Sequence, residues 1–367
     1  MDRSQKLKAK CQDDGSQNSE VRSIDVENMR GRRNCYDSSS LDENGHQFKS
    51  FDDVVWPMES LKIGVEQDRN EEGVVTVLED EYGKQYKVVS FDDIVFPIRM
   101  LEMGTRKRLS NVKNFQYKDG DVLLCSFPKT GTHWTANLIH YLMYDGPLDA
   151  LVSHSPCFID LFDIESAGQR EGRRIITSHL PPKRLPIEHF AKGGKTVLVF
   201  RNPKDTAVSQ FHQFRRLKLF GDFRLSWNSY INYWIDGKVP MGSYFDYYKN
   251  WQKDIQDNPE RDVLVVQYEN LKMDSLNQIR RIQTYLELNH SDERLRAVLE
   301  KCSLGNLKAD VESGKIKTAL IDEAGKSILY RKGIIGDWKN HFTVTQNEKI
   351  EAVMKEKFKD SMFNYNT

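Results

Sequence analysis

The sequence predicts an α/β fold in which helices flank a central parallel sheet that carries a phosphate-loop-like turn. Short apolar runs of strand length recur from about residue 115 onward, and patterns with helical spacing separate them. One of these runs leads through a Gly-containing turn directly into a helical pattern. Because continuous apolar strands that alternate with helices indicate a sheet covered on both faces, we expect a parallel sheet between two helical layers. The strand candidates are residues 121–126, 174–177, 196–200 and 263–266.

The N-terminal part of the chain has a different composition. Residues 1–40 are rich in Ser, Asn, Asp, Gln, Arg and Lys and show almost no apolar periodicity. Such a segment cannot bury enough surface to offset the entropy of ordering it, so we predict a disordered tail. An internal repeat follows, because Ser50–Pro57 reappears with few changes as Ser90–Pro97. We therefore predict the tail, an N-terminal extension over 41–89 that holds the first copy, and a single domain over 90–367.

Two apolar runs lie between the copies of the repeat. Residues 74–78 and 85–89 flank an acidic turn that contains Gly83, and this pattern predicts a β-hairpin. Two copies are too few for a solenoid, which needs at least three stacked units. We interpret the repeat as a duplicated lead-in segment.

Composition excludes several classes of partner. The chain has 54 basic and 54 acidic residues, so no global charge favours nucleic acid or an anionic membrane. No apolar stretch is long enough to span a bilayer, and the polar N-terminus lacks the apolar segment of a secretory signal. The five cysteines have no zinc-like spacing, and their odd number argues against a disulfide framework. We expect a cytoplasmic protein with free thiols.

The strand–turn–helix at 121–144 resembles a phosphate-binding loop. Its backbone N–H groups and helix N-terminus would attract an anion. Lys129 adds a mobile positive charge, and Thr130 and Thr132 are placed to cap the helix. In ATP and GTP hydrolases the loop lysine follows the last glycine, whereas Lys129 precedes Gly131.

A second cluster follows the strand candidate 196–200. Arg201 ends this strand, and Ser209 lies eight residues later in the next helix. Ligands of open α/β sheets bind beyond the carboxyl ends of strands, so Arg201 could make a forked contact with a second phosphate. Taken alone, Arg201 could equally form a surface ion pair with Asp205.

A third cluster lies near the C-terminus. Arg331 and Lys332 stand beside Gly333 and Gly336, which makes a flexible, positively charged segment suited to a terminal phosphate. Three such clusters on one α/β domain indicate a nucleotide with phosphates at two ends.

Together, the segments 128–134, 201–209 and 331–340 resemble the three signatures of the cytosolic sulfotransferases, and the similarity covers roughly 90–367. The resemblance implies the cosubstrate 3′-phosphoadenosine 5′-phosphosulfate (PAPS). It assigns the 5′-phosphosulfate to the first segment, the 3′-phosphate to the other two, and the adenine to an aromatic pair and a segment near residue 302. The implied contacts are Lys129, Thr130, Gly131, Thr132, His133 and Trp134 for the 5′ end, Arg201, Ser209, Arg331, Lys332 and Gly333 for the 3′ end, and Trp134, Tyr268, Cys302 and Leu304 for the adenosine.

The resemblance also implies the catalytic groups. His179 directly follows a strand candidate, and an imidazole has a pKa suited to taking a proton from an acceptor hydroxyl. The family pattern makes His179 the base, lets Lys129 stabilise the leaving oxygen, and lets Ser209 restrain Lys129 until an acceptor arrives. No metal is expected, because the protein supplies the cations.

The chain departs from the family pattern around the acceptor. Thr177 stands where many relatives have a lysine, and Leu304 stands where they usually have Phe. Two aromatic gate positions of the phenol-directed relatives fall on Cys157 and Gln213. The acceptor is therefore left open as a small molecule with a hydroxyl or an amine.

The C-terminal region matches the short dimerisation motif of the family at Lys339, Thr343, Val344 and Glu348, which predicts a homodimer. Two other functions stay open: a nucleotide-binding scaffold that has lost catalysis, and an ATP-dependent small-molecule kinase. The kinase would require Mg²⁺ and a loop lysine after the glycine.

Overall fold

The computed structural model describes residues 73–91, 94–98, 105–150, 157–160, 164–169, 172–316, 318, 320–363 and 365. The predicted tail 1–40 and the first copy of the repeat, Ser50–Pro57, lie outside the described residues.

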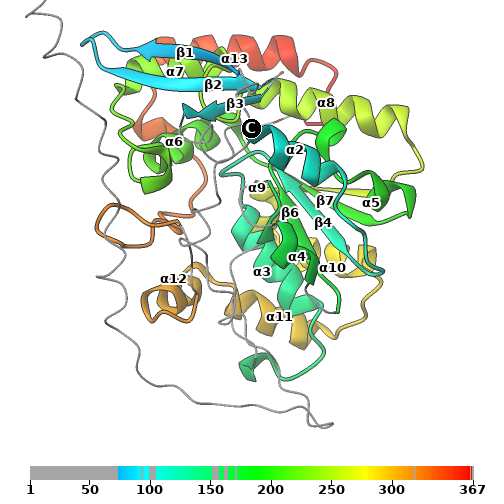
Figure 1. Ribbon diagram of the computed structural model, residues 1–367. Coiled ribbons are helices and arrows are strands. Elements are labelled where there is room, and N and C mark those ends of the chain that lie inside the picture. The colour runs from blue at the N-terminus through cyan, green and yellow to red at the C-terminus, as the bar shows by residue number, and fades with distance from the viewer. Residues whose placement is uncertain are drawn as a thin grey trace, which may run out of the picture. The chain divides into compact units, whose positions relative to one another are not determined.

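A five-stranded sheet with the strand order β5-β6-β4-β7-β8 forms the centre of the molecule. Figure 1 labels three of its strands, β6, β4 and β7. Every neighbouring pair in the sheet is parallel, as the sequence predicts. The two-residue edge strand β5 was not predicted, because two residues carry no periodicity. The strands are β4 (Val122–Ser126), β5 (Cys157–Phe158), β6 (Ile175–Ser178), β7 (Lys195–Phe200) and β8 (Val263–Gln267).

Helices cover both faces of this sheet (Figure 1). Alternate residues of a strand point to opposite faces, so Val122 and Leu124 of β4 pack against α3, α10 and α11. Leu123 and Cys125 face the larger core, which includes residues of α2, α6, α7, α8 and α13. The helices are α2 (Thr105–Lys113), α3 (Thr132–Leu142), α4 (Ile164–Gln169), α5 (Ile187–Ala191), α6 (Pro203–Phe214), α7 (Trp227–Ile235), α8 (Tyr244–Asp257), α9 (Tyr268–Met273), α10 (Ser275–Tyr285), α11 (Asp292–Lys301), α12 (Leu304–Glu312) and α13 (Val344–Lys357).

Four short 3₁₀ helices complete the described elements. They are η5 (Leu148–Ala150), η6 (Pro182–Arg184), η7 (Lys218–Phe220) and η8 (Asp337–Asn340). No helix in the described part of the chain is long and apolar enough to cross a membrane.

The predicted hairpin is confirmed. β1 (Val74–Glu79) and β2 (Gln85–Phe91) are antiparallel, and a third strand, β3 (Ile94–Pro97), pairs with β2. The turn closes through the Asp80 carboxylate, which accepts hydrogen bonds from the backbone N–H groups of Tyr82 and Lys84. The second copy of the repeat thus supplies β3 and the end of β2.

The small sheet packs onto the loops beyond the main sheet. The phenol of Tyr86 donates a hydrogen bond to the carbonyl of Phe220 (2.9 Å), and its ring lies 4.8 Å from that of Phe223. The backbone N–H of Met241 donates to the carbonyl of Val95 (2.6 Å). These contacts bring Pro97, at the end of β3, to the wall of the cavity described next.

Candidate active site

A cavity of about 400 Å³ lies at the carboxyl ends of β4, β6 and β7, where open parallel sheets bind their ligands. It brings together segments from the β4–α3 loop, the ends of two strands, α6, α9 and the region around residue 331. All but one of the predicted site residues line it, namely Lys129, Gly131, Thr132, His133, Trp134, His179, Arg201, Ser209, Tyr268, Cys302, Leu304, Arg331, Lys332 and Gly333. The exception is Thr130, which is buried beneath the loop.

The β4–α3 loop has a constrained backbone. Lys129 has a φ of 72° and Gly131 a φ of 107°, both in the left-handed region. A Cβ at Gly131 would lie 2.6 Å from Cδ2 of Tyr268, so only glycine fits there. The loop thus turns sharply between the end of β4 and the start of α3 at Thr132.

The predicted capping role of Thr130 and Thr132 is wrong. Gly131 is the N-cap of α3, and no side chain caps the helix. The hydroxyl of Thr130 donates to the carbonyl of Phe127 (2.7 Å), and that of Thr132 is hydrogen-bonded to the hydroxyl of Ser126 (2.7 Å). Because both hydroxyls bond back to the end of β4, the first-turn N–H groups of α3 keep no side-chain acceptor and suit an external anion.

Lys129 is the cation of this loop. Burial, together with the nearby charges of Arg201 and Arg331, lowers the pKa of its ammonium from 10.5 to about 8. An anion bound beside Lys129 would reverse this effect, because it favours the charged form.

His179 lies at the end of β6 and is held by two contacts. Its backbone N–H donates to Oδ2 of Asp160 (2.6 Å), and its Nδ1 lies 2.8 Å from the carbonyl oxygen of Ser126. A carbonyl only accepts, so Nδ1 carries the proton and Nε2 keeps its lone pair. Burial lowers the pKa of His179, although Asp160 and Ser126 act in the opposite direction. The neutral imidazole can therefore act as a base; sequence reasoning did not identify Asp160.

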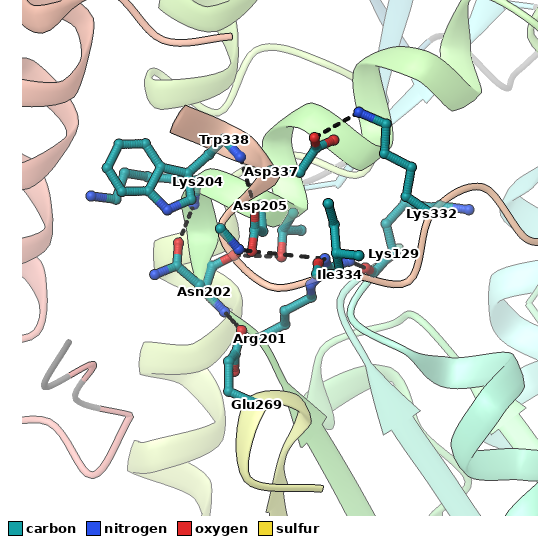
Figure 2. A network of polar contacts seen from close by, with 12 residues as sticks. Lys129, Arg201, Asn202, Lys204, Asp205, Glu269, Lys332, Ile334, Asp337 and Trp338 are labelled. Carbon is teal, nitrogen blue, oxygen red and sulfur yellow. Dashed lines mark hydrogen bonds and ion pairs between the residues drawn. The ribbon is translucent and has the colours of Figure 1, made fainter. Parts of the chain in front are cut away.

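Arg201 links two parts of the site. Its guanidinium donates to the carbonyls of Lys129 (3.2 Å) and Ile334 (3.1 Å), as Figure 2 shows, and lies over the ring of Tyr268 at 4.5 Å. Its Nε is buried and has no hydrogen-bond partner among the described residues. The ion pair with Asp205 exists at 3.9 Å, but it is buried and not on the surface, since the two side chains are 10% and 1% exposed.

Two carboxylates organise the segment that carries Arg331 and Lys332 (Figure 2). Asp205 of α6 accepts hydrogen bonds from the backbone N–H groups of Gly336 (2.7 Å) and Trp338 (2.9 Å). Asp337 accepts from Arg331 (2.5 Å) and Lys332 (2.7 Å). Burial alone would raise the pKa of Asp337, but the hydrogen bonds from the two cations outweigh it and hold the pKa well below its usual range. From the sequence, Asp205 was considered only as a surface ion-pair partner of Arg201, and Asp337 was assigned no role.

The C-terminal region supports the same corner of the site. The phenols of Tyr244 and Tyr365 each lie 2.5 Å from the carbonyl oxygen of Arg201. Lys204 donates to Asn347 of α13 (3.0 Å) and lies 3.6 Å from the ring centroid of Trp338. Residues far apart in the sequence thus fix the backbone around Arg201.

An aromatic pair also lines the cavity. The rings of Trp134 and Tyr268 lie 5.6 Å apart at 73°, and the indole N–H of Trp134 donates to the carbonyl of Cys302 (3.0 Å). Leu304 contacts Gly333 so closely that a Cβ there would lie 2.9 Å from Cδ2 of Leu304. The residues predicted to surround a purine therefore lie together.

The opposite side of the cavity is mainly apolar. The ring of Phe158 lies 4.8 Å from that of His179 and 5.3 Å from that of His133. Gln213, one of the two predicted gate residues, lines this side, whereas the side chain of Cys157 lies outside the described ones. The apolar lining includes Pro97, Phe214, Leu217, Phe220, Met241, Leu320 and Ile328.

Comparisons with known proteins agree with this geometry. Residues 119–362 match the family model of the sulfotransferase domain. Sulfotransferase 1B1 of Mus musculus is 30% identical over 70% of this chain and 88% of its own length, and sulfotransferase 2A1 of Homo sapiens is 30% identical over 67% and 87%. A crystal structure of the mouse sulfotransferase SULT7A1 complexed with PAP superposes with a TM-score of 0.63 at 28% identity, and covers 75% of this chain and 96% of that one.

Proposed function

Because the chain belongs to the sulfotransferase family, we propose that this cavity transfers the sulfuryl group of PAPS to a hydroxyl or amine of a small-molecule acceptor. The observation that carries the proposal is that one cavity is lined by the cation Lys129, the base His179 and the Trp134–Tyr268 pair, together with three further cations at 201, 331 and 332. PAPS suits such a cavity, because one ribose carries the anionic phosphosulfate at its 5′ position, the phosphate at its 3′ position and the adenine ring.

The residues of the cavity fit this nucleotide. Lys129 and the first turn of α3 suit the 5′-phosphosulfate, because both offer positive potential without a competing side-chain acceptor. Arg201, Arg331 and Lys332 line the same cavity and suit the 3′-phosphate. Asp337 pairs with the last two cations, so we expect them to exchange that carboxylate for phosphate oxygens.

The proposed mechanism depends on the protonation states of His179 and Lys129. PAPS supplies a sulfuryl group already attached to a stable leaving phosphate. Nε2 of His179 accepts the proton of the acceptor while its Nδ1–H stays on the Ser126 carbonyl. Lys129 stabilises the negative charge that develops on the leaving oxygen. Ser209 lines the same cavity from α6 and is proposed to restrain Lys129 before the acceptor binds.

The apolar side of the cavity supports an acceptor with a largely apolar body. Phe158 lies directly beside His179, so an acceptor must place its polar group between this ring and the nucleotide. The aliphatic residues beyond it favour burial of carbon rather than charge.

The test is transfer from radiolabelled PAPS to a panel of phenols, alcohols, steroids and amines, with a chelator present. We expect transfer with the unmodified chain and a loss of about 10²- to 10⁴-fold in kcat for His179→Ala. Binding of 3′-phosphoadenosine 5′-phosphate (PAP), the product, reports whether the variant is folded. Tight PAP binding without transfer to any acceptor would instead support a nucleotide-binding scaffold.

We also propose a homodimer formed through Lys339, Thr343, Val344 and Glu348. Val344 is 75% exposed at the start of α13, and Thr343 caps that helix, so an apolar side chain projects from a rigid turn. Sedimentation should give a dimer mass that Val344→Glu reduces to the monomer. Val75→Glu is the matched control, because Val75 is 50% exposed on β1, away from the motif. A monomeric mass for the unmodified chain would contradict the proposal.

A cytoplasmic location is proposed as well. Cys125 and Cys302 are both buried as free thiols, which suits a reducing compartment. Fractionation of cells that express the chain tests this location, and recovery with the membrane fraction would contradict it.

A further inference from the structure

The cavity is lined by cations and, among the described residues, by no aspartate or glutamate. The lysines and arginines that line it are Lys129, Arg201, Arg216, Lys272, Arg331 and Lys332. The proposed nucleotide site uses those at 129, 201, 331 and 332. The other two, at 216 and 272, have no part in the proposed transfer.

These two remaining cations lie on different sides of the cavity. The ammonium of Lys272 lies 5.6 Å from the ring centroid of Trp134, beside the residues proposed for the adenine. Arg216 follows the C-terminal end of α6 and stands in the chain between Phe214 and Leu217, which line the apolar side. Among the described lining residues, Arg216 is therefore the cation of the side proposed for the acceptor.

Arg216 is oriented by a single ion pair. Its Nη2 lies 2.9 Å from Oδ2 of Asp322, whose Oδ1 accepts hydrogen bonds from the backbone N–H groups of Ala324 and Lys326. This guanidinium has no further hydrogen bond within the described part of the chain, and its side chain is 47% exposed. Most of its N–H donors are therefore available to a ligand.

Arg216 lies away from the reacting end of the cavity. Ser209, which is proposed to contact Lys129, precedes Arg216 by about two helical turns, or about 10 Å along the axis of α6. An acceptor whose hydroxyl lies beside His179 would extend past the apolar side chains and bring its opposite end to Arg216.

The charges on the acceptor side select the group that this opposite end can carry. Asp322 pairs with Arg216 but does not line the cavity. A carboxylate of the acceptor would gain charge-assisted hydrogen bonds from the guanidinium. A protonated amine would find no carboxylate among the described lining residues and would be repelled by Arg216.

We propose that the acceptor is an apolar alcohol with an anionic group, such as a carboxylate, at the end remote from its reacting hydroxyl, and that Arg216 binds this group. The inference rests on the proposed function, since it names the class of acceptor that the same cavity takes. It makes Arg216 a residue that determines specificity and gives it no part in the chemical step.

Three matched acceptors test the class of substrate. They are ω-hydroxydodecanoate, its methyl ester and the amino alcohol of the same chain length, which share the hydroxyl and the apolar body. The measurements are kcat/KM at saturating PAPS and the dissociation constant of each acceptor from the chain loaded with PAP.

Three variants test the assignment to Arg216. Arg216→Gln removes the charge, and Asp322→Asn removes the carboxylate oxygen that competes for the guanidinium while its remaining oxygen can still support the turn. Arg215→Gln is the matched control, because Arg215 is the adjacent arginine and does not line the cavity.

In the unmodified chain we expect kcat/KM for the carboxylate to exceed that for the ester about three- to tenfold, with the amino alcohol the poorest acceptor. Arg216→Gln should abolish this preference, and Arg215→Gln should leave it unchanged. Asp322→Asn should increase it about two- to threefold, because the guanidinium then has no competing carboxylate.

A preference of the unmodified chain for the ester or the amino alcohol would overturn the inference. A preference for the carboxylate that persists in Arg216→Gln, or that Arg215→Gln abolishes equally, would also overturn it. If the unmodified chain transfers to no acceptor, the proposed function fails. Tighter binding of the carboxylate than of the ester to the PAP-loaded chain, lost in Arg216→Gln, would then still support the anion site, and its absence would exclude that site.

Discussion

The two proposed ends of the nucleotide site, the 5′ end at Lys129 and the 3′ end at Arg201, Arg331 and Lys332, keep their cations in opposite ways. At the 5′ end, Lys129 has no ion pair with any described carboxylate, and burial holds its pKa near 8. At the 3′ end, Arg331 and Lys332 share Asp337, and Arg201 lies 3.9 Å from Asp205.

The difference indicates a division of labour. An unpaired, partly desolvated cation gains most when negative charge develops beside it, so the 5′ end should govern the rate. Cations that are already paired with carboxylates must exchange these partners for phosphate oxygens, so the net free energy gained at the 3′ end is smaller. This gain is made when the nucleotide binds, so we expect it to affect affinity. The Asp205 and Asp337 contacts hold that end in shape before the nucleotide arrives.

The largest effect is expected at the 5′ end. Lys129→Met should lower kcat/KM for PAPS about 10²- to 10³-fold, because it removes the charge beside the leaving oxygen. PAP affinity should fall much less, as titration calorimetry can show. A loss of PAP affinity as large as the loss of rate would remove the distinction between the two ends.

A smaller effect is expected from the support of the 3′ end. Asp205→Asn replaces one of the two carboxylate oxygens that accept the N–H groups of Gly336 and Trp338 with an amide nitrogen, which cannot accept. We expect PAP binding to weaken about tenfold and the free energy of unfolding to fall by about 1–3 kcal/mol. The value of kcat at saturating PAPS should stay within about threefold. Asp257→Asn, on the exposed side of α8, is the control, and a similar change there would discount the result.

The pH dependence should separate the ends further. Lys129 is charged below its pKa of about 8 and neutral above it, so kcat/KM for PAPS should fall as pH rises, by up to about tenfold per pH unit above that value. Arginines stay charged over this range. The same measurement on Lys129→Arg should give a nearly flat profile. A steep fall in that variant would assign the titration to another group.

The smallest effect concerns the C-terminal support of Arg201. Tyr365→Phe removes one of the two phenols at the Arg201 carbonyl but leaves Tyr244, so PAP affinity should fall only about two- to threefold. Fluorescence titration of PAP is sensitive enough for this change. An unaltered affinity would show that Tyr244 suffices.

Local pattern was enough to predict the scaffold of this site. The strands β4, β6, β7 and β8 are short apolar runs, and the order of Lys129 and Gly131 distinguishes the loop from that of ATP and GTP hydrolases. Such features depend on residues adjacent in the chain, so they are visible in the sequence.

The partners of the site residues were not predictable in the same way. Asp160 holds the backbone of His179 from 19 residues away, and Asp205 bonds to N–H groups more than 130 residues later. These contacts depend on which loops lie together at the edge of the sheet. The spacing of residues along the sequence does not predict that arrangement. The capping prediction for Thr130 and Thr132 failed for a local reason, because the helix starts after Gly131 and both hydroxyls face β4.

The backbone of Lys129 has a consequence for thermal stability. Its left-handed conformation costs a residue other than glycine about 1–2 kcal/mol, whether or not a nucleotide is bound. Lys129→Gly would relieve this strain and remove a buried charge. The protein that results should melt at a higher temperature than the unmodified chain and yet be unable to stabilise the leaving oxygen. The conformation that holds the Lys129 ammonium in place thus lowers the stability of the fold. At this position, a substitution that raises the melting temperature lowers the turnover rate.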